Sequence, residues 1–143
     1  MVGAFLFDSE KSAFHDKLEA KMMKQISLAV LAGFYVLAGL NHFLNPEFYL
    51  PLIPDYLPYP EWINLASGLL EVFFGIALVP IFSRKWAVYA IIIMLLAFIP
   101  SHVYFIEIGG CVEDGLCAPL WVAWVRLVGV HPLLIAWAWY HRK

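Results

Sequence analysis

Two ionisable residues lie inside stretches of the sequence that are otherwise apolar. Glu71 is near the centre of LASGLLEVFFGIALV, residues 65–79, and Arg126 lies within an apolar stretch close to the C-terminus. An ionised carboxylate without a partner is costly in such surroundings, and so is a lone guanidinium. A Glu71–Arg126 ion pair is therefore the first prediction. Such a pair could only hold two helices together, or one of its members could bind a ligand or relay a proton.

Four further polar residues could share a pocket with this pair. Asn41 and His42 end one apolar stretch, His102 ends another, and Ser67 lies one helical turn before Glu71. We expect these residues to form a ligand or proton-relay pocket, in which no catalytic residue can yet be named. Two histidines and one carboxylate are also a minimal ligand set for non-haem iron. Because His42, His102 and Glu71 come from three separate stretches, their spacing does not support a metal site, and we expect none.

The composition indicates that a membrane surrounds these residues. The chain has 143 residues, of which 63% are hydrophobic and 14% are charged, and its mean hydropathy is +0.78, whereas soluble domains are about one quarter charged. Four apolar stretches are each long enough to cross a bilayer as a helix: residues 25–44, 62–82, 86–106 and 119–140. The expected fold is an all-α, four-helix bundle of a polytopic membrane protein, formed by residues 25–143. The absence of a basic patch argues against nucleic acid as a partner.

The distribution of basic residues predicts the orientation. Eight of the nine Lys and Arg residues lie before the first stretch, between the second and third, or at the C-terminus. The other two connections carry only acids, among them Asp55, Glu113 and Asp114. The positive-inside rule then places both termini in the cytoplasm of a bacterial cell, with the helices in the inner (plasma) membrane. Residues 1–24 are expected to be an interfacial amphipathic helix or a cytoplasmic tail.

Helical spacing predicts which faces meet inside the bundle. On the second stretch, polar and small residues share one face, which should pack against the bundle: Asn64, Ser67, Gly68, Glu71, Gly75 and Leu78. Glu71 and Arg126 are expected at depths of about 14 and about 10 Å below the same surface. His131 follows Arg126 by five residues, about 140° around an α-helix, and is expected to point elsewhere. Pro100 should kink the third helix.

The sequences of the two acidic connections predict further structural features. Residues 45–62 contain five prolines and several aromatic residues, which predicts either a stiff cap over the outer mouth of the bundle or an aromatic belt. Cys111 and Cys117, the two cysteines, are expected to form a local disulfide on the oxidising side. It could be a structural staple or a redox-active pair, and the spacing does not match the C-x-x-C motif of thiol oxidoreductases.

The motifs also resemble those of a known family. AGLNHFLNPEFYLPLIPDYLP, SGLLEVFFGIALV, FIPSHVY and WVRL occur in an order and spacing similar to that of the DoxX-like family of small bacterial membrane proteins, over about residues 30 to 140. The chain differs where that family often has Asn in place of His102, and after Leu127, where Val128–Pro132 replaces a Pro- and Gln-containing segment. The resemblance implies a four-helix membrane bundle. Relatives of that broader group include subunits of thiosulfate:quinone oxidoreductase and a maturation factor for methylamine dehydrogenase.

The leading hypothesis is an accessory subunit of a quinone- or thiol-linked redox system that binds a small amphiphile. A quinone is the candidate cofactor, with Arg126 or His42 donating to its carbonyl and Glu71 relaying a proton. The expected surroundings are the lipid bilayer and a membrane or periplasmic redox protein, and a homo-oligomer is compatible with the sequence. The alternatives are a membrane assembly factor or chaperone without chemistry, and a small-molecule transporter. The sequence alone leaves open whether the protein is an enzyme.

Overall fold

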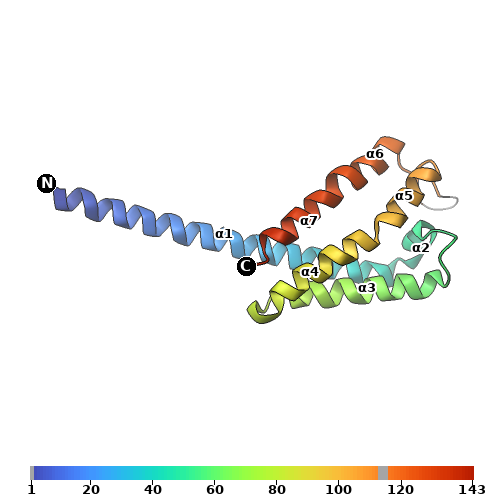
Figure 1. The fold of residues 1–143 in the computed structure, drawn as a ribbon, viewed down its shortest axis with the longest axis horizontal. Helices are drawn as coiled ribbons and strands as arrows, with labels where there is room; N and C mark the ends of the chain where they lie inside the picture. The colour runs from blue at the N-terminus through green and yellow to red at the C-terminus, as the bar shows by residue number, and fades with distance from the viewer. Residues whose placement is uncertain (1, 113–115) are drawn as a thin grey trace.

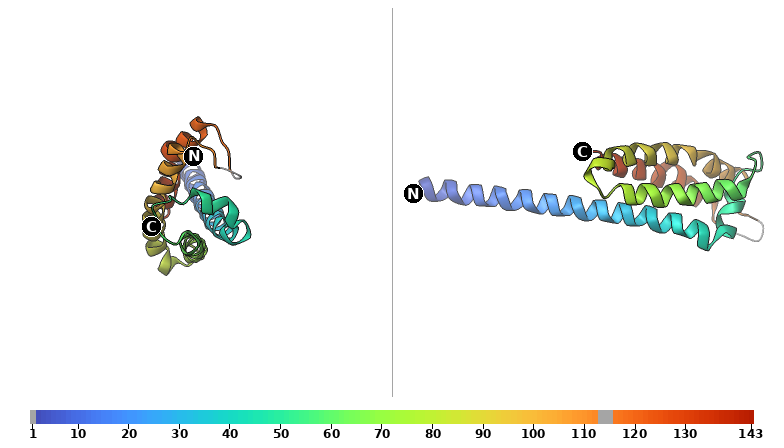
Figure 2. Two further views of the ribbon diagram at one scale, coloured as in Figure 1. Left: turned by 90° about the vertical axis from the view of Figure 1, so that its right-hand side faces the viewer. Right: turned by 90° about the horizontal axis from the view of Figure 1, so that it is seen from below.

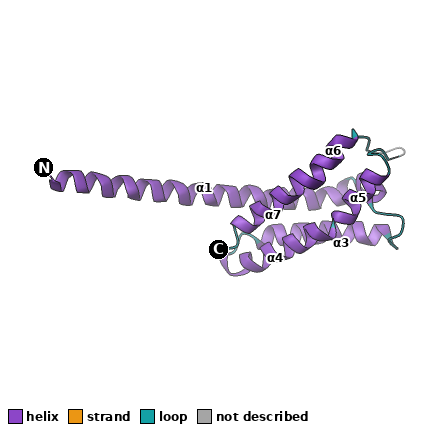
Figure 3. Cartoon of the chain, turned by 45° about the horizontal axis from the view of Figure 1, so that its top comes forward, coloured by secondary structure: helices purple, strands orange, loops and turns teal. Residues whose placement is uncertain are grey.

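The chain forms a set of helices packed side by side, with one long helix extending far beyond the others (Figure 1). A computed structural model describes residues 2–112 and 116–143, with side chains from residue 14 onward. Helices joined by short connections make up almost all of the described chain, and no strand occurs in it (Figure 3). The predicted all-α class is therefore confirmed.

The long helix is α1, which runs without interruption from Val2 to Leu44. Its N-terminal half projects past the end of the other helices in two perpendicular views (Figures 1 and 2). The structure thus has no break near residue 24, where the sequence analysis placed the boundary between an N-terminal segment and the first span. Neither Gly nor Pro occurs between Gly3 and Gly33, so nothing in this stretch interrupts the helix. Helix α1 ends just before Pro46, which disfavours helical geometry at the preceding residue.

The second long element, α3 (Pro60–Ala77), packs antiparallel along α1 (Figure 2). Glycines make the contact close: a Cβ on Gly39 would lie 2.6 Å from the carbonyl oxygen of Gly68, and one on Gly68 would lie 2.7 Å from the Cβ of His42. The predicted inward face of α3 is confirmed, because its small and polar residues are buried: Asn64, Gly68, Glu71 and Gly75.

The third helical stretch consists of α4 (Ile81–Ala97) and α5 (Ile99–Glu107), which are separated at Phe98. Pro100 follows this interruption, so the predicted disturbance of the helix at Pro100 is confirmed. The fourth stretch contains α6 (Leu120–Val125), a π-helical turn η2 (Arg126–Val130) and α7 (His131–Tyr140). Helix α4 packs against both α3 and α7, so the order of neighbours is α1, α3, α4 and α7.

Three stretches of the described chain are long and apolar enough to cross a membrane: Phe14–Leu44, Ile81–Glu107 and Leu120–Tyr140. Many large apolar side chains on their outer faces are exposed, Leu37, Ile93 and Leu133 among them. Helix α3 is shorter, and its Glu61, Asn64 and Glu71 make it more polar. The fourth predicted span therefore stays a prediction.

The connection between α1 and α3 folds over one end of the helices. It contains the short helix α2 (Pro46–Tyr49) and the 3-10 turn η1 (Leu50–Leu52), and we call residues 45–59 the cap. Leu52 is buried with Phe105 and Ala123 in a small apolar cluster. The hydroxyl of Tyr104 donates to Asp55 Oδ2 over 2.9 Å, which ties the cap to α5.

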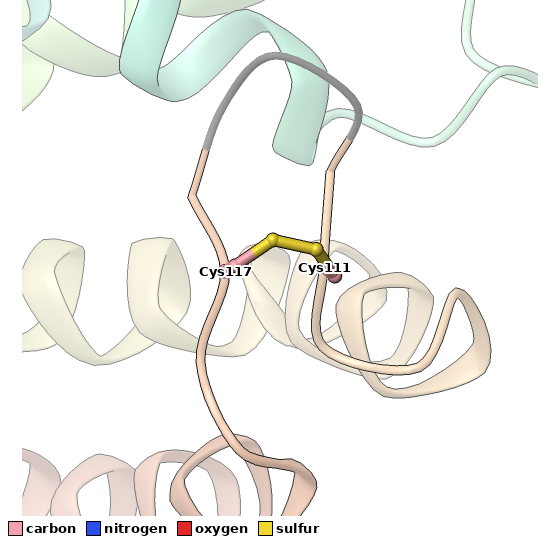
Figure 4. Close-up of a disulfide and its surroundings, with 2 residues drawn as sticks. All are labelled: Cys111 and Cys117. Carbon is pink, nitrogen blue, oxygen red and sulfur yellow. A yellow bond between two sulfur atoms is a disulfide. The ribbon is translucent and has the colours of Figure 1, made fainter.

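The connection between α5 and α6 lies at the same end and contains the two cysteines. Cys111 and Cys117 are joined by a disulfide, as predicted, with their Cα atoms 4.0 Å apart (Figure 4). They also form an isolated antiparallel bridge, and Val112 donates its N–H to the carbonyl of Leu116. Val112 and Leu116 pack against the apolar cluster under the cap. The disulfide therefore closes the connection on itself, and Val112 and Leu116 hold it against the capped end.

At the opposite end, α1 and α7 meet through a buried polar contact. Trp137 Nε1 donates to Ser27 Oγ over 2.8 Å, and Ser27 Oγ lies 3.0 Å from His141 Nε2. Burial, with Lys24 and Arg84 nearby, lowers the pKa of His141. The neutral ring can therefore accept the Ser27 hydroxyl proton. The main apolar core of α1, α3, α4 and α7 surrounds this end, and it leaves a polar region between itself and the cap.

The glycine contact between α1 and α3 can be tested with two matched substitutions. Gly68→Ala would force a Cβ against His42, and we expect a loss of about 1–3 kcal/mol in unfolding free energy. In Gly33→Ala, the new Cβ meets nothing within 4 Å, so the higher helix propensity of Ala should leave stability unchanged or raise it by about 0.5–1 kcal/mol. Thermal unfolding in detergent measures both, and equal behaviour of the two variants would refute the close contact.

Candidate functional site

Two adjoining cavities lie in the polar region between the core and the cap. One, next to the cap, has a volume of about 230 Å³, and the other, between α1 and α7, has a volume of about 280 Å³. Each is close to the lower limit of about 300 Å³ for small-molecule sites. We call the two together the polar cavity, and their shared wall consists of His42, Tyr49, Glu71, Phe98, His102 and Arg126.

Most of the predicted site residues line this cavity. His42, Glu71, His102 and Arg126 lie in the shared wall, and Ser67 lines the part next to the cap. Asn41 does not line the cavity itself. Its side-chain amide donates to the hydroxyl oxygen of Tyr49, which does, over 2.8 Å. The structure therefore brings five of the six predicted residues together around one cavity, and their role as a site stays a prediction.

A reciprocal pair of hydrogen bonds fixes the protonation of one His42 nitrogen. Asn64 Nδ2 donates to the backbone carbonyl of His42 over 3.0 Å, so its Oδ1 faces His42 Nδ1 at 2.7 Å. An amide oxygen only accepts, and Nδ1 must therefore carry the proton. The other ring nitrogen, Nε2, faces the carboxyl group of Glu71.

Glu71 pairs with His42 and not with Arg126, which corrects the first prediction. Its Oε2 lies 3.7 Å from His42 Nε2, and among the described residues no ion pair joins Glu71 to Arg126. Equal depth does not fix the direction around a helix axis, and the close packing of α3 on α1 turns Glu71 toward His42. Because His42 Nδ1 already carries a proton, Nε2 is the ring nitrogen that faces the Glu71 carboxyl group.

The cavity also contains polar groups that lack protein partners. Within the described chain, Tyr35 Oη and Glu71 Oε2 are buried without a hydrogen-bond partner. The two residues are only 2% and 6% exposed, and both line the part of the cavity between α1 and α7. Buried polar groups without partners are rare in native proteins, and they commonly indicate a water, an ion or a ligand.

Tyr49 joins the cap to the site. Its ring stacks on that of His42, with the ring centroids 3.6 Å apart and the planes 21° from parallel. Because the amide of Asn41 donates to the Tyr49 oxygen, the phenolic hydrogen is left for another acceptor. The cap thus contributes a hydrogen-bond donor to the shared wall.

The π-helical turn η2 places Arg126 and His131 on the same side of the fourth helical stretch. The N–H of His131 donates to the carbonyl of Arg126, five residues earlier. Pro132 explains the wider turn, since it has no N–H and its ring would clash with the carbonyl four residues before it. The prediction that His131 points away from this site was wrong, because it assumed α-helical geometry throughout.

His131 in turn fixes the position of the third helical stretch. Its Nε2 donates to the carbonyl of Leu95 over 2.6 Å, close to the interruption at Phe98. The ring of His102 lies against that of His131, with the centroids 4.7 Å apart. Within the described chain, no three His, Cys, Asp or Glu side chains come together as a metal site, so the alternative set of His42, His102 and Glu71 has no geometric support.

The polar cavity reaches the outer surface between α1 and the fourth helical stretch. Helices α1 and α7 meet at Ser27 and Trp137, and nearer the cap Phe34 of α1 and Val130 of η2 both line the cavity. Each of these two side chains is 44% exposed. The opening therefore lies on the apolar outer surface of the helices, part-way along their length.

Residues 31–142 match the family described as "Domain of unknown function (DUF8561)". The chain belongs to this family. The matched region includes every residue of the polar cavity, the cap and the disulfide, and it begins within α1. No curated protein and no solved structure matches the chain.

Four site residues were not singled out from the sequence as members of the pocket: Tyr35, Tyr49, Asn64 and His131. Tyr35 precedes His42 by seven residues, and this spacing of two helical turns could have identified it. Asn64 lies seven residues before Glu71 and was recognised only as part of the inward face of α3. Tyr49 depends on how the cap folds, and His131 depends on a π-turn, so spacing could not place either of them.

The Asn64–His42 contact is testable by stability measurements. Asn64→Ala would leave the His42 Nδ1–H and carbonyl without partners, and we expect a loss of about 1–3 kcal/mol in unfolding free energy. Ser101→Ala is a matched control, since Ser101 lines the same cavity and makes no side-chain hydrogen bond within the described chain. Thermal unfolding that gave the same midpoint for the two variants would contradict the reciprocal pair.

Proposed function

We propose that the chain is a multi-pass protein of the bacterial inner (plasma) membrane and that its polar cavity binds a small amphiphile. The proposal is supported by the three apolar helices and by the exposed apolar side chains around them. In this proposal α3 is a fourth span, whose Asn64 and Glu71 are tolerated because they face α1 rather than lipid.

The proposed topology has both termini in the cytoplasm. Three basic residues gather at the end opposite the cap, where Lys24 Nζ lies 3.5 Å from the carbonyl of Lys143 and Arg84 lies near His141. Asp55 lies in the cap at the other end, while Glu113 and Asp114 lie outside the described residues. This distribution of charge supports a cap on the periplasmic side.

The resemblance to the DoxX-like family is part of the same proposal. The motifs that carry it contribute His42, Glu71 and Arg126, and all three side chains line one wall. If this chain and the DoxX-like proteins are related in function, their shared motif residues should lie together in one site. Together with that resemblance, the site supports an accessory subunit of a quinone- or thiol-linked redox system.

The single observation that carries ligand binding is the set of polar groups left without partners in a cavity that opens to the apolar surface. Tyr35 and Arg126 could donate to a carbonyl oxygen of a quinone, which when bound would supply two-electron redox chemistry. The His42–Glu71 pair could give or take one proton at the Nε2···Oε2 contact. The disulfide lies outside this wall, and in the proposal it is a structural staple.

A binding experiment tests this function. Purified protein is titrated with ubiquinone or menaquinone, and thermal unfolding is followed for the wild type and for Glu71→Gln. A ligand at about 100 times its dissociation constant adds about 2.7 kcal/mol of stability, so we expect the wild-type midpoint to rise by several degrees. The rise should be smaller in Glu71→Gln and unchanged in Arg142→Gln, because Arg142 lies outside the cavity and donates to the carbonyl of Trp139. Absence of a shift in every protein, with both quinones, would reject quinone binding.

A second candidate function is favoured by the length of α1. Residues 14–22 of this helix are exposed and extend beyond the other helices (Figure 2), so they could hold a partner protein during its assembly. In that case the cavity would have no chemical role, and the double variant Glu71→Gln, Arg126→Met would leave maturation of the partner intact. Loss of partner maturation in a folded double variant would favour a function for the cavity.

A further inference from the structure

We infer that the polar cavity binds amphiphiles with a negatively charged headgroup, a carboxylate or a phosphate, more tightly than uncharged ones, and that Arg126 binds this headgroup. The inference rests on the proposed function, because it assumes that an amphiphile occupies the cavity. It goes further by specifying the charge of the headgroup and the wall that recognises it.

The first argument is the ion pairing in the cavity wall. Glu71, the acid that lines both parts of the cavity, faces His42, with its Oε2 3.7 Å from His42 Nε2. Arg126 has no carboxylate partner within the described chain. The other titratable groups around the cavity are neutral or basic types: Tyr35 from α1, Tyr49 from the cap, His102 from α5 and His131 from α7. Among the described residues, Arg126 is therefore a cation in the cavity wall without an ion-pair partner.

An unpaired cation inside a membrane has a high free-energy cost, so such residues usually pair with an anion or belong to a functional site. Water in the cavity would hydrate the guanidinium but would leave its charge uncompensated. An anion would remove this cost, and the planar fork of Arg fits a carboxylate or a phosphate with two parallel hydrogen bonds.

The second argument is the set of donors beside Arg126. Tyr49 and His102 line the shared wall together with Arg126. The phenolic hydrogen of Tyr49 is free because its oxygen already accepts from Asn41. His102 makes no side-chain hydrogen bond within the described chain and can present a ring N–H. Donors from the cap, α5 and η2 thus converge on one place, which suits a headgroup rich in acceptor oxygens.

The third argument is the apolar path that leads away from these donors. The cavity continues along Phe34, Ala38 and Leu134 to the opening between α1 and α7. Phe34 and Val130 are partly exposed there, on the apolar outer surface. An acyl chain whose acidic headgroup was held at Arg126 could leave by this path into the surrounding lipid. The ligand class that fits is a single-chain acidic amphiphile that enters from the bilayer.

The experiment compares ligands that differ in headgroup charge. Full-length protein in nanodiscs of uncharged phospholipid is titrated with palmitate, dodecyl phosphate, palmitamide and menaquinone, and binding is measured by displacement of a fluorescent fatty acid. We expect palmitate or dodecyl phosphate to bind the wild type at least about tenfold more tightly than palmitamide, and the stronger of the two identifies the headgroup. This comparison uses the wild type alone, so it does not depend on the folding of any variant.

Variants then locate the charge preference. Arg126→Gln should reduce the preference for the acid over the amide to about one, Arg126→Lys should retain most of it, and Arg142→Gln, which changes an arginine at the opposite end, should leave it unchanged. Equal affinity for palmitate and palmitamide would overturn the inference. So would a charge preference that survives Arg126→Gln or disappears in Arg142→Gln.

The same titration separates the two proposals. Binding of menaquinone or palmitamide without a preference for acids would leave amphiphile binding in place and reject the negative headgroup. Failure of all four ligands and of the fluorescent fatty acid to bind the wild type would reject both.

Discussion

The close approach of α1 and α3 is the constraint on which the site depends. Gly39 and Gly68 allow the two backbones to come together, and any larger side chain there would separate them. This contact brings Asn64 and Glu71 on one helix against His42 on the other. In a hydrocarbon environment such packing, together with hydrogen bonds between helices, replaces the hydrophobic effect as the cause of association. The glycines thus determine which residue Glu71 meets.

The pairing of Glu71 with His42 affects the other side chains that line the cavity. Once Glu71 is paired with His42, Arg126 is left without a carboxylate partner among the described residues, in a wall that also contains Tyr49 and His102. The cavity persists because apolar clusters close it at both ends, the main core at one end and the Leu52 cluster under the cap at the other. The interruption at Phe98 and the π-turn at Arg126 lie at the level of the cavity, where both helices depart from regular α geometry. Such departures are frequent at functional sites.

Much of the fold and part of the site could be predicted from the sequence. Stretches of about 20 apolar residues specify helices, and the spacing of Asn64, Gly68, Glu71 and Gly75 specifies the buried face of α3. The predicted disulfide between Cys111 and Cys117 followed from their separation by a short turn. The ion-pair partner of Glu71 could not be predicted, because depth along a helix says nothing about which neighbour lies across the interface. The position of His131 was missed because one proline changed the local pitch of the helix.

The central claim is that Glu71 is coupled to His42 while Arg126 is left for a ligand, and two double-mutant cycles on the unliganded protein measure this most directly. The first combines Glu71→Gln with His42→Gln, and the second combines Glu71→Gln with Arg126→Met, with unfolding free energy as the observable. The account predicts an interaction energy of about 0.5–3 kcal/mol for the first cycle and less than about 0.5 kcal/mol for the second. A larger interaction energy between Glu71 and Arg126 than between Glu71 and His42 would contradict it.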